Sequence, residues 1–355
     1  MPGPIPVTLI AGFLGAGKTT LLNRILKGEH GLRVAVLVND FGAVNIDSEL
    51  IVGVEGETVS LANGCICCTI RDDLLNAALA VVSRHEPPEY IVIEASGVSD
   101  PYSIAQTFLL PSLQPYTRLD SIVAVVDAEQ IRDIGPQNEM LAMDQIGAAD
   151  LVVLNKVDLV TPAALGAVRG WIRDISPDAR VMETTFGQVS LDLLLGVGRY
   201  DPERLLERPA RDGHAHAAGE DDDHDHDHSA VFSTWTYASD EALSQAALER
   251  ALDSLPPTIY RAKGFIWLRE NPVRKIVLQV VGKRASLSLG ELWSEDGPRR
   301  TQIVMIGAHG KLQPERLKAV FDQCRAGAPP ASADEKLKQA LDLSLIHISE
   351  PTRPY

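Results

Sequence analysis

Cysteine is scarce in this chain, and its few positions are not spread along the sequence. Only four cysteines occur among 355 residues, and three of them stand together at Cys65, Cys67 and Cys68. A secreted domain held by disulfides would distribute its cysteines more widely. The pattern therefore excludes a disulfide framework and favours a metal or redox site in a reducing compartment, which we expect to be the cytoplasm.

Long apolar runs and an excess of positive charge are also lacking. No run reaches the ~18 apolar residues that a transmembrane helix needs, so we expect no such helix. The 48 acidic side chains outnumber the 33 basic ones and give a net charge of −15, which argues against binding to nucleic acid or to an anionic membrane. No basic side chain precedes Lys18, so the N-terminus does not resemble a secretory signal.

The residues that are present predict a folded protein of two domains. Hydrophobic side chains make up 45% of the chain, and its length exceeds what one compact core usually holds. Within residues 1–205, short apolar runs alternate with longer helical patterns. Runs that are apolar throughout are typical of strands buried on both faces of a mostly parallel sheet, so we predict an α/β domain. The predicted strands are residues 7–11, 34–39, 90–94, 121–127, 151–155 and 180–184.

Composition changes abruptly at residues 212–228, which contain seven carboxylates, five histidines and no Lys or Arg. No apolar side chain there is larger than alanine, so this segment cannot bury a core. We therefore predict an acidic, histidine-rich linker over residues 206–230.

Globular composition returns in residues 231–326. Strand-like runs at 231–237, 264–268, 275–281 and 301–306 alternate with helical patterns at 240–254 and 313–325, which predicts a smaller α+β domain. Residues 327–342 are expected to form a disordered tail. Residues 343–355 resemble an in-frame translation of a sequencing adapter, so we expect them to be non-native; an ordinary disordered tail is the alternative.

A phosphate-binding loop is predicted between the first strand and a helical pattern at 19–27. Residues 12–19 read GFLGAGKT and fit the pattern G-x-x-x-x-G-K-[ST], which identifies a P-loop nucleoside triphosphatase. Glycines let consecutive N–H groups point at phosphate oxygens, Lys18 would neutralise β- and γ-phosphate charge, and the Thr19 hydroxyl would ligate Mg²⁺. A glycine-rich turn with a chance lysine is the alternative. The expected phosphate contacts are Gly12, Gly15, Ala16, Gly17, Lys18, Thr19 and Thr20.

The end of the 151–155 strand carries a second nucleotide motif, Asn155-Lys156-Val157-Asp158. A carboxylate such as Asp158 can accept both the N1–H and the exocyclic amine of guanine, a donor pair that adenine lacks. Placed about 140 residues after a phosphate loop and at a strand end, the motif favours GTP over ATP, although alone it could be a simple turn.

Glu94 ends the 90–94 strand and is followed by Ala-Ser-Gly. A carboxylate beside the phosphate loop suits a Mg²⁺ ligand or a group that orients water, and Gly97 could bring its N–H to the γ-phosphate. A polar cluster that merely ends the strand is the alternative. Together with Lys18 and Thr19, Glu94 is therefore a candidate catalytic residue.

The cysteine cluster Cys65-Ile66-Cys67-Cys68 offers three thiolates, which suit Zn²⁺, Cu(I) or Co²⁺. Because C-x-C-C is too cramped to close a tetrahedron alone, a fourth ligand or an open position is implied. An open site favours metal transfer over a permanent structural role. A buried turn of small residues is the alternative.

In combination, the motifs GFLGAGKTT, NDFG, NGCICC, EASGVSDP and NKVD resemble the CobW-like family of P-loop GTPases, relatives of the urease and hydrogenase nickel-insertion GTPases. The second half also resembles that family's C-terminal domain. The resemblance implies GTP hydrolysis coupled to delivery of a transition metal, commonly Zn²⁺ or Co²⁺. It assigns metal binding to Cys65, Cys67 and Cys68, and places Asp40 in a first switch segment as a candidate ligand. Family members commonly have glutamate where this chain has Ser60, which leaves the non-cysteine ligands open.

Five histidines of the linker alternate with acids and small residues, and neutral imidazole binds Zn²⁺, Ni²⁺ and Co²⁺. We interpret them as a weak metal-gathering arm, with an acidic spacer as the alternative. They are His214, His216, His224, His226 and His228.

The leading hypothesis is a GTP-dependent metallochaperone whose partners are GTP and a client apo-metalloprotein. A homodimer is compatible with the sequence. Two other functions remain open: a GTPase of cobalamin biosynthesis or metalloenzyme maturation, and a histidine-rich zinc store. Cys324 lies on a predicted helix and is expected to pack in the core.

Overall fold

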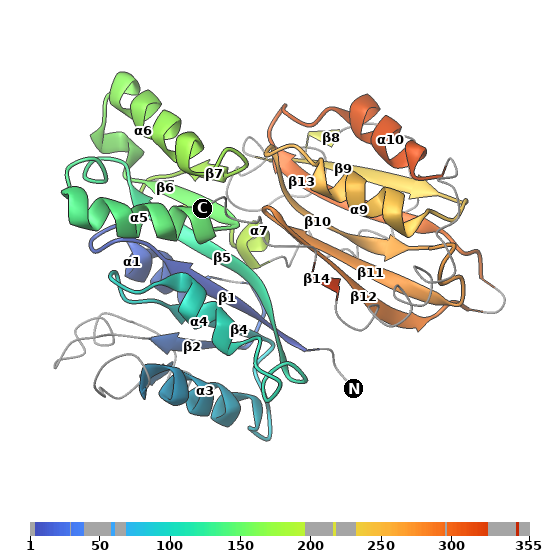
Figure 1. The fold of residues 1–355 in the computed structure, drawn as a ribbon, viewed down its shortest axis with the longest axis horizontal. Coiled ribbons are helices and arrows are strands. Elements are labelled where there is room, and N and C mark those ends of the chain that lie inside the picture. Colours follow the sequence, from blue (N-terminus) through green and yellow to red (C-terminus); the bar gives the residue numbers. More distant parts are fainter. Residues whose placement is uncertain are drawn as a thin grey trace. The chain divides into compact units, whose positions relative to one another are not determined.

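The computed structural model describes residues 4–28, 30–38, 58–60, 69–195, 216–217, 232–294, 297–325 and 346–347. The chain divides into two compact units, Met1–Leu195 and Gly196–Tyr355. Each unit has its own seven-stranded sheet (Figure 1).

The first unit contains a parallel sheet with the strand order β3-β2-β4-β1-β5-β6-β7. The predicted α/β class is thus confirmed, and β4 and β6 have the predicted bounds. The short β3 was not predicted, and residue 39 of the expected second strand lies outside the described part. The strands are β1 (Ile5–Ala11), β2 (Val34–Val38), β3 (Thr58–Ser60), β4 (Tyr90–Glu94), β5 (Thr117–Asp127), β6 (Leu151–Asn155) and β7 (Arg180–Glu183).

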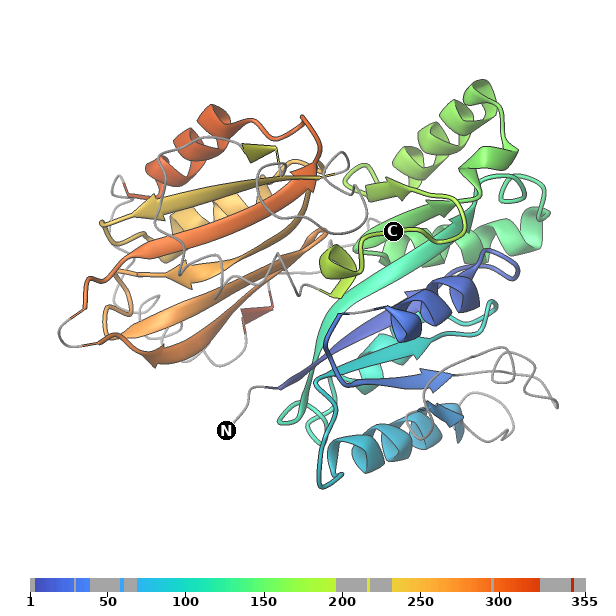
Figure 2. The ribbon, with the colours of Figure 1, turned by 180° about the vertical axis from the view of Figure 1, so that it is seen from behind.

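Helices cover both faces of this sheet. Alternate residues of β1, Val7 and Leu9, share a buried cluster with Leu74 of α3 and Ile104 of α4. α4 and α5 lie in front of the sheet in Figure 1, whereas α1 lies in front of it in the reverse view of Figure 2. The central strands are consequently buried on both sides, as their continuous apolar runs predict. The helices are α1 (Lys18–Lys27), α3 (Thr69–Val82), α4 (Pro101–Thr107), α5 (Pro136–Ala148), α6 (Pro162–Ile175) and α7 (Leu191–Leu195).

The second unit has an antiparallel sheet in the order β14-β12-β11-β10-β13-β9-β8, with α9 and α10 on one face. In Figure 2 the strands lie in front of α9. The predicted α+β class is confirmed. The elements of this unit are β8 (His216–Ala217), β9 (Phe232–Ser239), α9 (Gln245–Asp253), β10 (Ile259–Ile266), β11 (Arg274–Val281), β12 (Arg284–Leu292), β13 (Thr301–Ala308), α10 (Pro314–Gln323) and β14 (Ile346–His347).

The largest differences from the sequence-based expectation in this unit concern two boundaries and one strand. The first helix begins at Gln245 rather than at residue 240, because Leu243 is held in an extended bridge to Leu268. β10 begins at Ile259 rather than at 264. β12 was not predicted, although its apolar side chains alternate with serines as is typical of a strand in an antiparallel sheet with one buried face.

Two short strands come from segments that were expected to lack structure. His216–Ala217 of the linker forms β8 against β9, and Ile346–His347 of the tail forms β14 against β12. The other residues of the predicted linker up to 230, and of both tail segments, lie outside the described residues. Among those that are described, no helix is long and apolar enough to cross a membrane.

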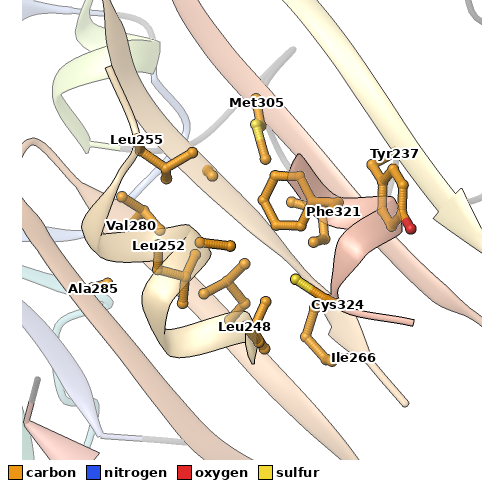
Figure 3. Close-up of a cluster of buried hydrophobic side chains, with 14 of the residues drawn as sticks. Tyr237, Leu248, Leu252, Leu255, Ile266, Val280, Ala285, Met305, Phe321 and Cys324 are labelled. Carbon is orange, nitrogen blue, oxygen red and sulfur yellow. The ribbon is translucent and has the colours of Figure 1, made fainter. Parts of the chain in front are cut away.

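The core of the second unit lies between its helices and its sheet (Figure 3). Trp235 of β9, Leu248 of α9 and Phe321 of α10 belong to it, and each is at most 4% exposed. Cys324 joins this core as predicted, and burial raises the pKa of its thiol to about 11. At 1% exposure among apolar side chains, its sulfur is a packing group of the core.

We predict that replacing Leu248 by Ala lowers the free energy of unfolding by about 2–5 kcal/mol, because a fully buried leucine leaves a cavity. The matched change Leu292→Ala, at a side chain that is 58% exposed, should alter it by less than about 0.5 kcal/mol. Urea unfolding followed by tryptophan fluorescence checks both, since Trp235 lies in the same cluster as Leu248. Equal losses from the two variants would contradict this packing.

Candidate nucleotide-binding site

The phosphate loop connects β1 to α1 and depends on backbone shapes that favour glycine. Gly12, Gly15 and Gly17 have φ angles of +138°, +76° and +103°. A Cβ atom at Gly12 would lie 2.2 Å from the carbonyl oxygen of Val125 in β5, and one at Gly17 would lie 2.4 Å from Nδ2 of Asn155. The loop is therefore pressed against the ends of β5 and β6 with no room for side chains at these two positions.

Three predicted site residues meet at this loop. Lys18 is 7% exposed, and its Nζ donates a hydrogen bond to the carbonyl oxygen of Phe13 at 3.3 Å. The Thr19 hydroxyl donates to Oε1 of Glu94 at 2.8 Å, and Glu94 is 3% exposed. A buried carboxylate beside a hydroxyl is a pair of hard oxygen donors, which fits Mg²⁺. Of the remaining loop residues, Ala16 is buried and Thr20 is exposed on the first turn of α1.

The segment that follows β4 contacts the phosphate loop directly. Ala95 donates its backbone N–H to the carbonyl oxygen of Ile10 at 2.9 Å. A Cβ atom at Gly97 would lie 2.8 Å from the backbone nitrogen of Leu14, so only glycine allows this approach. The predicted contact of Gly97 with a γ-phosphate stays a prediction, and its backbone lies beside the loop as that contact requires.

Asn155, which was predicted to bind the nucleotide, uses both ends of its carboxamide within the protein. Its Nδ2 donates to the carbonyl oxygen of Ala16 at 3.0 Å, and its Oδ1 accepts the N–H of Gly187 at 3.0 Å. The side chain is 2% exposed. In this structure Asn155 positions the phosphate loop, and its contact with a nucleotide stays a prediction.

Lys156 has a left-handed backbone with φ of +60°, and its ammonium pairs with Asp127 at 2.6 Å. The other oxygen of Asp127 accepts the N–H of Glu129 at 2.9 Å, so this carboxylate is fixed at the end of β5. Asp158 lies exposed in the short 3₁₀ turn Val157–Leu159 that follows β6. Its carboxylate is therefore accessible for the predicted contact with a base.

Sequence reasoning missed three contributors to the site. Asp127 could have been noticed as the acidic end of a predicted strand. Gly187 follows β7 in a polar turn, beside the exposed Phe186 with φ of +51°. Gln145 lies inside α5 and matches no motif, yet its Nε2 donates to the carbonyl oxygens of Gly97 and Ser99 at 3.3 and 3.2 Å.

The predicted metal ligands Cys65, Cys67, Cys68 and Asp40 lie outside the described residues, as do His214, His224, His226 and His228. His216 lies in β8, and only its strand pairing is described. Within the described residues, no group of three His, Cys, Asp or Glu side chains could hold a metal ion.

The segments that flank the cysteine cluster are described. β3 ends at Ser60 and α3 begins at Thr69, directly after Cys68. Ser60 pairs with Val38 of β2, and Val38 pairs in turn with Glu94 of β4. Ser60 and Glu94 therefore lie at the carboxyl ends of parallel strands, on the same side of the sheet. They are two strands apart, or about 10 Å, and the cysteine segment follows Ser60 in the chain.

Comparison with known proteins finds a matching family model for each of the two units. Residues 6–183 match the family model "CobW/HypB/UreG, nucleotide-binding domain", and residues 232–325 match "Cobalamin synthesis protein cobW C-terminal domain". The zinc chaperone CobW of Pseudomonas aeruginosa is 36% identical over 85% of this chain and 87% of its own length. The zinc chaperone YjiA of Escherichia coli is 32% identical over 90% of this chain and 98% of its own. The zinc-regulated GTPase metalloprotein activator 1 of Dictyostelium discoideum is 32% identical over 86% of this chain and 76% of its own. The chain thus belongs to the CobW/HypB/UreG family, with a CobW-type C-terminal domain after the nucleotide-binding domain.

Proposed function

We propose that this chain is a GTP-hydrolysing metallochaperone that binds Zn²⁺ at Cys65, Cys67 and Cys68 and transfers it to a client apo-metalloprotein. The observation that carries the proposal is the shared sheet edge: the strand that leads to the cysteine segment ends in register with Glu94, which bonds Thr19 of the phosphate loop. A nucleotide and a metal would therefore act on neighbouring parts of one edge.

The phosphate loop supports triphosphate binding. Its glycine conformations leave backbone N–H groups free of side-chain crowding, α1 places its positive N-terminus below the loop, and Lys18 adds a full charge. Thr19 and Glu94 would hold Mg²⁺, which when bound supplies positive charge to the β- and γ-phosphates. The protein's own part is to fix these oxygens and the lysine before the nucleotide arrives.

Coupling between nucleotide and metal follows from this geometry. Residues 39–57 connect β2 to β3, and Val38 at the end of β2 pairs with Glu94 on one side and with Ser60 of β3 on the other. We infer that this segment, with Asp40, closes when a γ-phosphate is present and helps to complete the metal site. Loss of that phosphate would loosen the segment and free the metal for a client.

Zinc is the preferred cargo because relatives are named zinc chaperones, and Co²⁺ is the alternative that metal competition would test. We place the protein in the cytoplasm, where thiols stay reduced. A metallochaperone requires a client protein, which co-purification would identify. A homodimer would be detected by its mass in solution.

We predict that Asp158→Asn lowers affinity for GTP by about 100-fold or more, because an amide replaces a charged acceptor of two base N–H groups. The same variant should gain affinity for xanthosine triphosphate, whose base offers an oxygen where guanine has its amine. Binding of fluorescent nucleotide analogues measures both. Asp174→Asn, at an exposed acid of α6, is the control that should leave both affinities unchanged. Undiminished GTP binding by Asp158→Asn would contradict the assignment of the base site.

We expect the triple change of Cys65, Cys67 and Cys68 to Ser to abolish the dependence of zinc affinity on the nucleotide. In the unchanged chain, Zn²⁺ should bind more tightly with Mg²⁺ and a non-hydrolysable GTP analogue than with GDP, as competition with a chromophoric chelator would show. The triple variant should lose at least about 100-fold in affinity, since thiolates supply the main ligands. Cys324→Ser, in the core of the second unit, should preserve the nucleotide dependence. If the triple variant also preserved it, metal and nucleotide would not be coupled through these cysteines.

Deletion of residues 212–228 should remove weakly bound zinc but retain one nucleotide-dependent site. Imidazoles on an acidic segment raise the local metal concentration without forming the transfer site. Metal-to-protein ratios after dialysis would measure this, with a variant that changes only the five linker histidines to Asn as the matched comparison. Loss of nearly all bound zinc on deletion would instead favour a storage protein.

A further inference from the structure

Residues 96–99 form a tight turn between β4 and α4. Ser99 donates its N–H to the carbonyl oxygen of Ser96 at 3.0 Å, and Asp100 caps α4 through the N–H of Tyr102 at 2.9 Å. Gly97, in the middle of the turn, touches the phosphate loop at Leu14. The turn therefore lies between Glu94 and the start of a helix, against the phosphate loop.

One buried side chain from a different element holds this turn. Gln145 of α5 is 1% exposed, and its Nε2 donates to the carbonyl oxygens of Gly97 and Ser99 at 3.3 and 3.2 Å. α5 itself is anchored, because Ala142 and Ile146 pack in the cluster formed with β5, β6 and α6. The Gln145 amide is thus carried by a helix that is itself packed in a buried cluster.

We propose that Gln145 is the positioning residue that sets the preference of this site for GTP over GDP. By fixing the carbonyl groups of Gly97 and Ser99, it holds the turn of residues 96–99 against the phosphate loop at Leu14, where we expect the γ-phosphate to lie. This inference rests on the proposed function, since it assigns a role within the same GTP site.

The two nucleotides should depend differently on this contact. The α- and β-phosphates would be held by the loop of residues 12–19 and by the N-terminus of α1, which Gln145 does not touch. We expect only a third phosphate to reach beyond the loop toward residues 96–99. Loss of a side chain that supports this turn should therefore lower the affinity for GTP and leave the affinity for GDP unchanged. Loss of a residue needed only for general stability would lower both affinities.

The test compares Gln145→Leu and Gln145→Glu with the unchanged chain. Leucine fills similar space but leaves both carbonyl groups without their donor. We expect affinity for a non-hydrolysable GTP analogue to fall about tenfold, the size expected of one or two net hydrogen bonds, while GDP affinity changes by less than about twofold. The kcat for GTP hydrolysis should fall in parallel. Isothermal titration with Mg²⁺ present gives both affinities.

Gln145→Glu keeps the shape and adds a pH test. At pH 7.5 its carboxylate would face two carbonyl oxygens and weaken GTP analogue binding at least as much as leucine. Burial raises the pKa of a carboxyl group, so at pH 5.5 the protonated form would donate one hydrogen bond and restore part of the preference. If Gln145→Leu does not fold, Gln145→Glu still tests whether this side chain sets the preference for GTP over GDP.

Gln245→Leu is the matched control, because Gln245 is also a buried glutamine, 2% exposed, but lies in α9 of the second unit. It should leave the ratio of GTP to GDP affinity unchanged. Equal losses for both nucleotides in the Gln145 variants, or an unchanged ratio, would overturn the inference while leaving the proposed function intact. If the unchanged chain bound neither nucleotide, the proposed function itself would fail.

Discussion

The carboxamide of Asn155 is the contact on which the geometry of the nucleotide site depends. Its two ends join three segments that are far apart in the sequence: Ala16 in the phosphate loop, the end of β6, and Gly187 after β7. A buried amide that both donates and accepts has little freedom, since losing either partner leaves a polar group without compensation. The protein's own groups therefore support the loop in its glycine-dependent conformation. Preorganisation of this kind reduces the reorganisation that binding would otherwise require.

A second set of contacts surrounds the loop on its other side. Gly97 lies against Leu14, Thr19 bonds Glu94, and the ends of β2 and β3 lie in register with Glu94. The loop is thus fixed by β6 on one side, while on the other it meets segments that lead toward the cysteines. This asymmetry separates the part that we propose to recognise the base from the part that we propose to respond to the third phosphate. Such a division suits a protein in which nucleotide state and a second ligand are linked.

Elements with continuous apolar runs could be predicted from sequence almost to the residue, as β4 and β6 show. The runs stand out because strands buried on both faces are mostly apolar. β12 was not predicted, although its apolar residues alternate with serine as is typical of a strand with one buried face. In the site, glycine and lysine at a fixed spacing identified the phosphate loop, since the chemistry needs those residue types there. Gln145, Asp127 and Gly187 could not be found in this way, because their roles arise from tertiary packing between segments that have no fixed spacing.

The position of β1 in the sheet has a consequence for synthesis of the chain. This strand is made before the other strands of its sheet, yet its two neighbours are β4 and β5, so residues 91–94 and 117–124 must appear before it is paired on both edges. Until then an apolar strand has open edges, which favour association with other chains. The phosphate loop is fixed later still, because the hydrogen bonds from Ala16 through Asn155 to Gly187 can form only after residue 187 has been made. A nascent chain should consequently acquire its affinity for nucleotide late and in one step, when most of the first unit has left the ribosome.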